Sequence, residues 1–138
     1  MAEALFMHRK GTDDWVAESA GVFAAQGSPA SSHAIAALKE LGINFRSHRS
    51  QLVTKELLEG ADLVLTMTNG HRYSLLQNFS EFERKVYLLN AFGTSKIPSD
   101  VLDPFGGSLE MYQKTCDEID RLIGDLVLFL HTNKNQKK

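Results

Sequence analysis

An apolar stretch at residues 61–67 is the feature that most limits the folds open to this chain. Such a run is typical of a β-strand that is buried on both faces, as in a parallel sheet covered by helices. Residues 69–79 then have a helical pattern, and residues 85–89 form another short extended run. Because parallel strands need a crossover between them, this order predicts an α/β domain with a parallel sheet.

Helical signals also precede this unit. Residues 2–9 consist mostly of good helix formers. Ser28 and Pro29 predict the start of a second helix with the proline in its favoured first turn, and Gly42 predicts its end. Thr54 is predicted to cap a short helical turn before the apolar stretch. The apolar residues of the second helix are Ile35, Ala36, Leu38 and Leu41.

A long C-terminal helix is predicted to begin at Ser108. The only cysteine, Cys116, lies on its apolar face, so no internal disulfide can form and we expect a core residue. A single thiol suits a reducing compartment, which favours the cytoplasm. Residues 133–138 are expected to form a polar tail on a single domain that spans residues 1–138. The predicted apolar face consists of Leu109, Tyr112, Cys116, Ile119, Leu122, Ile123 and Leu126.

Composition excludes several classes of partner. The 138 residues have 43% hydrophobic content and a net charge of -2, which allows one core but gives no general attraction to nucleic acid. No segment approaches the roughly 18 apolar residues of a membrane span. His33 and His71 do not have the spacing of metal ligands, so neither a metal nor another cofactor is expected.

Short motifs occur in three parts of the chain: MAEALF at residues 1–6, ESAG at residues 18–21 with ADLVLTM at residues 61–67, and LDPFGGS at residues 102–108. These motifs resemble those of the low-molecular-weight protein tyrosine phosphatase family. They cover nearly the whole chain in the family's order and match its first helix, its second and third strands and its aspartate-proline loop. This resemblance implies a three-layer sandwich around a small parallel sheet of four strands. Phe105 before two glycines is most similar to the bacterial protein-arginine phosphatase branch.

One family motif is absent from the 138 residues. The resemblance implies a central first strand and a C-x5-R phosphate loop before residue 1, and these would supply the cysteine nucleophile and an arginine fork. Neither group is in the sequence. We therefore expect the chain to be N-terminally truncated, most simply through a misassigned start, and to be inactive as it stands. A deliberate truncation and a degenerate paralogue are the alternatives.

The resemblance assigns catalysis to the aspartate-proline loop. Asp103 would be the general acid and then the general base, whereas the alternative is an ordinary turn aspartate before proline. Phe105 would form one wall of the substrate slot, and the alternative is an aromatic side chain that anchors the loop. Gly106 and Gly107 would allow a tight turn and leave the mouth of the slot open.

Ser19 and His48 match family residues that brace the phosphate loop. The alternatives are a plain turn serine and a surface histidine. Three arginines could steer an anionic substrate, but solvated positions are favoured for them. These are Arg46, Arg49 and Arg72.

The resemblance implies a protein phosphatase that acts through a cysteinyl-phosphate. Its substrates would be phosphorylated proteins, with phosphoarginine preferred and phosphotyrosine second, and the family resemblance favours a monomer. A thioredoxin-linked arsenate reductase is disfavoured because it needs further cysteines. A catalytically dead phosphatase-like module that binds a partner is the alternative of another class.

Overall fold

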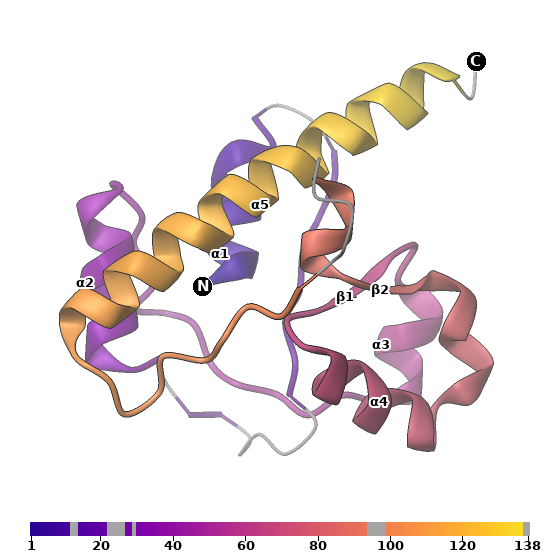
Figure 1. Cartoon of the computed structure of the whole chain (residues 1–138), viewed down its shortest axis with the longest axis horizontal. Helices are drawn as coiled ribbons and strands as arrows, with labels where there is room; N and C mark the ends of the chain where they lie inside the picture. Colours follow the sequence, from indigo (N-terminus) through magenta and orange to yellow (C-terminus); the bar gives the residue numbers. More distant parts are fainter. Residues whose placement is uncertain (12–13, 22–26, 29, 94–98, 137–138) are drawn as a thin grey trace.

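The computed structural model describes residues 1–11, 14–21, 27–28, 30–93 and 99–136. Helices predominate, and short strands lie in the middle of the sequence (Figure 1). In chain order the elements are α1 (Ala2–Arg9), α2 (Ser32–Glu40), α3 (Lys55–Gly60), β1 (Val64–Thr66), α4 (Asn69–Asn78), the 3-10 helix η1 (Ser80–Lys85), β2 (Val86–Leu88), the 3-10 helix η2 (Leu89–Phe92) and α5 (Leu109–Gln136).

Strands β1 and β2 form a parallel pair, with Val64 opposite Val86 and Thr66 opposite Leu88. The chain between them passes through α4 and η1, as the crossover rule requires. The predicted α/β class with a small parallel sheet is therefore confirmed. Four strands are not: the described residues hold this pair and an isolated parallel bridge between Gly21 and Leu52.

The strand predicted at residues 61–67 is shorter in the structure, where β1 covers Val64–Thr66, because the first residue of that stretch belongs to the end of α3. Ala61 is the C-cap of α3, and its carbonyl accepts a hydrogen bond from Lys85 Nζ at 2.6 Å. Within the strand, Leu65 packs against one apolar cluster and Val64 against another. The sheet thus has helices on both sides, which agrees with the layered architecture.

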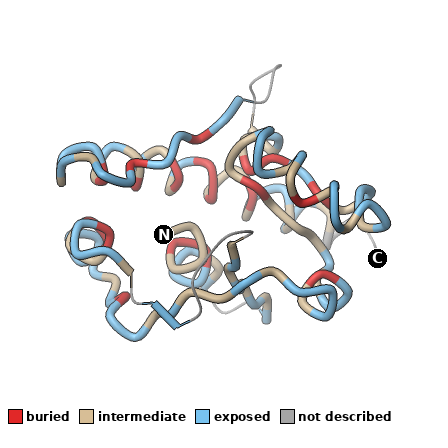
Figure 2. The backbone as a smooth tube through the Cα atoms, turned by 90° about the horizontal axis from the view of Figure 1, so that it is seen from below, coloured by how far each residue is buried: buried red, intermediate tan, exposed pale blue. Residues whose placement is uncertain are grey.

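Helix α5 crosses the molecule, and α1 and α2 pack against it (Figure 1). The buried residues of these helices face one another in the second view (Figure 2). Leu5 and Leu38 are fully buried, and Leu122 is 1% exposed. The predicted apolar face of α5 is confirmed for Tyr112, Cys116, Ile119, Leu122, Ile123 and Leu126, whereas Leu109 is half-buried.

A second cluster joins α3, α4 and β2 through Leu58, Leu75 and Val86. Threonines begin both helices of this cluster. Thr54 Oγ1 accepts a hydrogen bond from Leu57 N at 3.2 Å, and Thr68 Oγ1 accepts one from His71 N at 3.0 Å. The predicted cap at Thr54 is confirmed.

The predicted start of α2 was wrong. Ser31 is the cap, because its Oγ accepts a hydrogen bond from Ala34 N at 3.2 Å, and the helix begins at Ser32. Pro29 lies outside the described residues. The buried face also differs: Leu38 is buried as expected, together with Ala34 and Ala37, whereas Ile35 and Ala36 are half-buried and Leu41 is exposed.

At the other end of the chain, α5 continues to Gln136. The first part of the predicted polar tail is therefore helical. None of the helices in the described ranges is both long and apolar enough to cross a membrane.

Candidate functional site

The loop that carries Asp103 is attached where β1 ends. Val101 N donates a hydrogen bond to the carbonyl of Met67 at 2.8 Å, and the Val101 side chain is 2% exposed. Pro104 is also buried. Asp103 therefore lies between two buried anchors at the carboxyl end of a parallel strand, where sites form in such sheets.

Asp103 and Phe105 are linked within the loop. Asp103 Oδ1 accepts a hydrogen bond from Phe105 N at 3.0 Å, and Gly107 N donates to the carbonyl of Pro104 at 2.8 Å. Gly106 has a φ of 81°, a conformation that favours glycine. Both Asp103 and Phe105 are exposed to solvent. The aspartate thus makes the local turn and still presents its carboxyl group.

Phe105 is not an anchor of this loop. Its side chain is 83% exposed, and Val101 and Pro104 provide the buried contacts. The anchoring alternative for Phe105 is therefore wrong. An aromatic ring held open beside a carboxyl group is available to a substrate.

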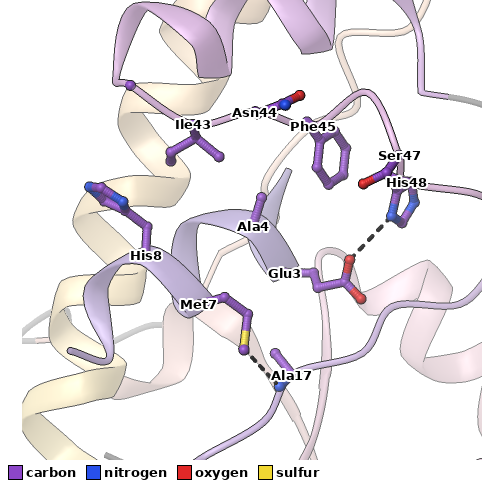
Figure 3. A pocket seen from close by; sticks show the side chains of 11 residues that line it. Glu3, Ala4, Met7, His8, Ala17, Ile43, Asn44, Phe45, Ser47 and His48 are labelled. Carbon is purple, nitrogen blue, oxygen red and sulfur yellow. Dashed lines mark hydrogen bonds and ion pairs between the residues drawn. The ribbon is translucent and has the colours of Figure 1, made fainter. Parts of the chain in front are cut away.

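Glu3 connects the two predicted bracing residues. Its Oε2 lies 3.2 Å from His48 Nδ1, and its Oε1 accepts a hydrogen bond from Ser19 N at 3.0 Å (Figure 3). Gln51 Nε2 donates to the carbonyl of Ser19 at 2.9 Å. The structure thus brings Ser19 and His48 together through the first turn of α1. Sequence reasoning missed Glu3, because its partners lie 16 and 45 residues away along the chain.

His48 is held rather than solvated. Its ring stacks on Phe45 with centroids 4.4 Å apart and an interplanar angle of 15°. The side chain is 20% exposed and that of Glu3 is 22% exposed. The surface-histidine alternative is therefore wrong.

An open pocket of about 420 Å³ lies on this side of α1 (Figure 3). Glu3 and His48 are at one end of its lining, and Met7 and His8 extend it along the helix. Ile43 contributes an apolar wall. The bracing residues thus border a hollow that is partly polar and partly apolar.

Cys116 is unsuited to nucleophilic attack. It is 1% exposed and lies in the first half of α5. Burial raises the pKa of its thiol, and the carboxylates of Asp117 and Asp120 raise it further. A raised pKa lowers the thiolate fraction that would attack phosphorus.

His33 and two of the three arginines have structural contacts. The His33 ring lies 5.5 Å from that of Tyr112. Arg49 donates to the carbonyls of Arg46 and His48, and Arg72 donates to that of Val86. Within the described ranges no three His, Cys, Asp or Glu side chains come together as metal ligands.

Comparison with known proteins places these features in a family. The family model for low molecular weight phosphotyrosine protein phosphatase matches residues 1–138. The chain belongs to this family. A protein-arginine-phosphatase of Bacillus subtilis is 43% identical over 129 residues, which are 91% of this chain and 84% of the relative. The low molecular weight protein-tyrosine-phosphatase PtpB of Staphylococcus haemolyticus is 32% identical over 114 residues, covering 83% and 78% of the two chains.

Solved structures agree with this assignment. The YwlE arginine phosphatase from Geobacillus stearothermophilus superposes with a TM-score of 0.92 at 39% identity, covering 99% of this chain and 87% of that one. The predicted family and its arginine-phosphatase branch are thus confirmed. As a member of this family, the protein is a phosphatase, which is a hydrolase that acts on phosphoproteins.

Proposed function

We propose that this chain belongs to a protein phosphatase that removes phosphate from arginine side chains through a cysteinyl-phosphate. The observation that carries the proposal is the loop in which exposed Asp103 lies between the buried Val101 and Pro104 and accepts a hydrogen bond from the backbone of the exposed Phe105. The nucleophile is assigned to the family's C-x5-R loop, which is not among these 138 residues. No metal or cofactor is needed for this chemistry, and a single free thiol suits the cytoplasm. The family resemblance favours a monomer.

In the first step the thiolate sulfur attacks phosphorus and the P–N bond breaks. Asp103, in its carboxylic acid form, donates its proton to the departing nitrogen, so that arginine leaves without a negative charge on nitrogen. Phe105 stacks against the planar guanidinium group. Because Phe105 is 83% exposed, its ring is free to make that contact.

In the second step the Asp103 carboxylate takes a proton from water. The water oxygen attacks phosphorus, the S–P bond breaks, and inorganic phosphate leaves with the thiolate restored. Asp103 ends the cycle protonated. A related arginine phosphatase structure, 40% identical to this chain, carries a phosphorylated active-site serine. A side chain at that site can therefore hold the phosphoryl group, as the proposed intermediate requires.

Glu3, Ser19 and His48 form a hydrogen-bonded group at the start of α1. We assign them the role of fixing the first turn of α1, which in the family follows directly on the phosphate loop. Both carboxylate oxygens of Glu3 are engaged, one by Ser19 N and one by His48 Nδ1. Such contacts keep a helix terminus in the orientation that a bound phosphate needs.

Phosphotyrosine is the second candidate substrate. A low molecular weight protein tyrosine phosphatase structure from T. tengcongensis has 42% identity to this chain, close to the 43% of the Bacillus subtilis arginine phosphatase. Overall similarity therefore does not separate the two substrates. The choice depends on the walls of the slot, of which Phe105 is one.

The test is phosphate release by the full-length protein purified from its source. Matched substrates are a protein phosphorylated on arginine and a peptide phosphorylated on tyrosine. We expect a higher kcat/KM on phosphoarginine, and a preference for phosphotyrosine would favour the second candidate. Mass spectrometry of the same sample identifies its first residue. An inactive protein that begins at Met1 and still binds a phosphoprotein would support the binding-module alternative instead.

A further inference from the structure

Asp100 connects the catalytic loop to a helix that is distant in sequence. Asn69 N donates a hydrogen bond to Asp100 Oδ1 at 2.7 Å, across 31 residues of sequence. Asn69 is the first residue of α4, so its N–H belongs to the terminus where an α-helix leaves donors unpaired. A carboxylate at this terminus also interacts favourably with the helix dipole.

The neighbours of Asp100 are attached to the same region. Ser99 Oγ accepts a hydrogen bond from Asn90 Nδ2 at 2.7 Å, and Val101 N donates to the carbonyl of Met67 at 2.8 Å. Three successive residues therefore fix the chain just before Leu102 and Asp103. Of these three, Asp100 alone makes its contact through a charged side chain.

We propose that Asp100 is a positioning residue that holds the Asp103 loop over the reaction centre; this inference rests on the proposed function. Leu102 is 74% exposed and Asp103 is exposed, so neither is held by packing. The placement of the acid therefore depends on the anchors on either side of it. General acid catalysis requires the carboxyl group to stay within hydrogen-bond reach of the leaving atom.

A plain helix cap is the competing explanation, and Thr68 provides the comparison. Thr68 Oγ1 accepts a hydrogen bond from His71 N at 3.0 Å and so caps the same end of α4. The hydrogen bond of the Thr68 side chain stays within α4 and its N-cap, whereas that of Asp100 joins α4 to the segment 99–103. Removal of either side chain weakens the terminus of α4. Only the removal of Asp100 also takes away one of the three contacts that hold the loop.

The experiment compares Asp100→Ala, Asp100→Asn and Thr68→Ala in the full-length protein. The substrates are phosphotyrosine, which has a poor leaving group, and a nitrophenyl phosphate, which has a good one. We expect Asp100→Ala to lower kcat on phosphotyrosine by about tenfold, the effect of losing one charge-assisted hydrogen bond. KM should change little, and kcat on the nitrophenyl substrate should fall by less.

Asp100→Asn should recover most of the loss, because its amide oxygen can still accept from Asn69 N. Thr68→Ala should lower the unfolding midpoint but reduce kcat on the two substrates equally or not at all. If Asp100→Ala and Thr68→Ala give the same leaving-group dependence, Asp100 is a helix cap and the inference is wrong.

Amide hydrogen exchange tests the contact between Asp100 and α4 independently of the proposed phosphatase function. The amides of Asn69 and Val101 should exchange faster in Asp100→Ala than in Thr68→Ala. Equal exchange would contradict the loop contact itself. A wild-type protein without phosphatase activity would overturn the proposed function and the catalytic role of Asp100 together. An active wild type with an unaffected Asp100→Ala variant would overturn only the role of Asp100.

Discussion

Glu3 and His48 lie 45 residues apart in sequence, yet Glu3 Oε2 is 3.2 Å from His48 Nδ1. The other carboxylate oxygen of Glu3 accepts from the backbone N–H of Ser19. One side chain therefore joins the first turn of α1 to two separate loops. Because both oxygens are engaged, the orientation of the carboxylate is fixed.

Substitutions of Glu3 should separate its geometry from its charge. Glu3→Ala removes both contacts and should lower the free energy of unfolding by about 1–2 kcal/mol. Glu3→Gln should cost less, because the amide oxygen can still accept from Ser19 N. Urea unfolding of both variants gives the comparison. Equal losses would show that Glu3 acts only through its negative charge.

Cys116 should not react with thiol reagents in the folded protein. It is 1% exposed, and the raised pKa keeps its sulfur protonated. Modification by a disulfide reagent should begin only in urea and follow the unfolding transition. Residues 1–138 alone should also release no nitrophenol from para-nitrophenyl phosphate. Activity of this chain that is blocked by thiol reagents would make Cys116 a nucleophile and contradict its assignment to the core.

Arg9 and Asp120 should make stability depend on acid pH. Arg9 Nε lies 2.6 Å from Asp120 Oδ1, and this hydrogen bond lowers the pKa of Asp120 below its ordinary value of 3.8. The contribution of the pair is therefore complete above pH 3.8 and is lost as the pH falls through the lower folded-state pKa. Since the Arg9 side chain is 41% exposed, screening limits the effect to about 1 kcal/mol or less.

The measurement is urea unfolding of wild type and Asp120→Asn at neutral pH and at the lowest pH where both fold. The difference in unfolding free energy should be present at neutral pH and shrink in acid. Asp62→Asn, at an exposed aspartate outside the ion pairs described above, is the matched control and should change little. A difference that stays constant with pH would show that Asp120 acts through packing.

Features set by nearby residues could be predicted from the sequence. Thr54 could be identified as a helix cap because a cap and its donor are close in sequence. Its hydroxyl oxygen accepts a hydrogen bond from the N–H of Leu57, three residues later. The helical spacing of the apolar residues in α5 predicted its buried face, because only the side chains on one side of the helix pack into the core. The predicted start of α2 was wrong because Ser28 and Ser31 are equally plausible caps in the sequence. In the folded chain Ser31 is the cap, since its hydroxyl oxygen accepts a hydrogen bond from Ala34 N.

Contacts between distant segments could not be predicted. The position of Asp103 in a loop follows from its motif, but the anchors that fix this loop do not. Asp100 meets Asn69 only because the parallel sheet brings the end of β1 beside the segment before Asp103. Glu3 likewise meets Ser19 and His48 only in the folded chain. No local pattern of residues records such contacts.

Asp103→Asn is the sharpest test of the proposed chemistry. The asparagine keeps an oxygen for the N–H of Phe105, which Asp103 Oδ1 accepts at 3.0 Å, so the turn should survive. It has no carboxyl proton to donate, and general acid catalysis contributes about 10²–10⁴-fold. In the active full-length protein we therefore expect a loss of this size in kcat on phosphotyrosine and on phosphoarginine, whose leaving atoms must be protonated. An aryl phosphate with a leaving group of low pKa should lose less in the first step.

Asp103→Ala is the matched control, because it removes the acid and the turn together. If Asp103 is the acid, Asp103→Asn and Asp103→Ala should show the same steep dependence of kcat on leaving-group pKa, with KM nearly unchanged because the phosphate loop holds the substrate. Asp103→Ala should in addition lower stability, since Phe105 N loses its acceptor. A small and uniform loss in Asp103→Asn, with a large loss only in Asp103→Ala, would show that Asp103 serves the turn. The general acid would then have to be another residue.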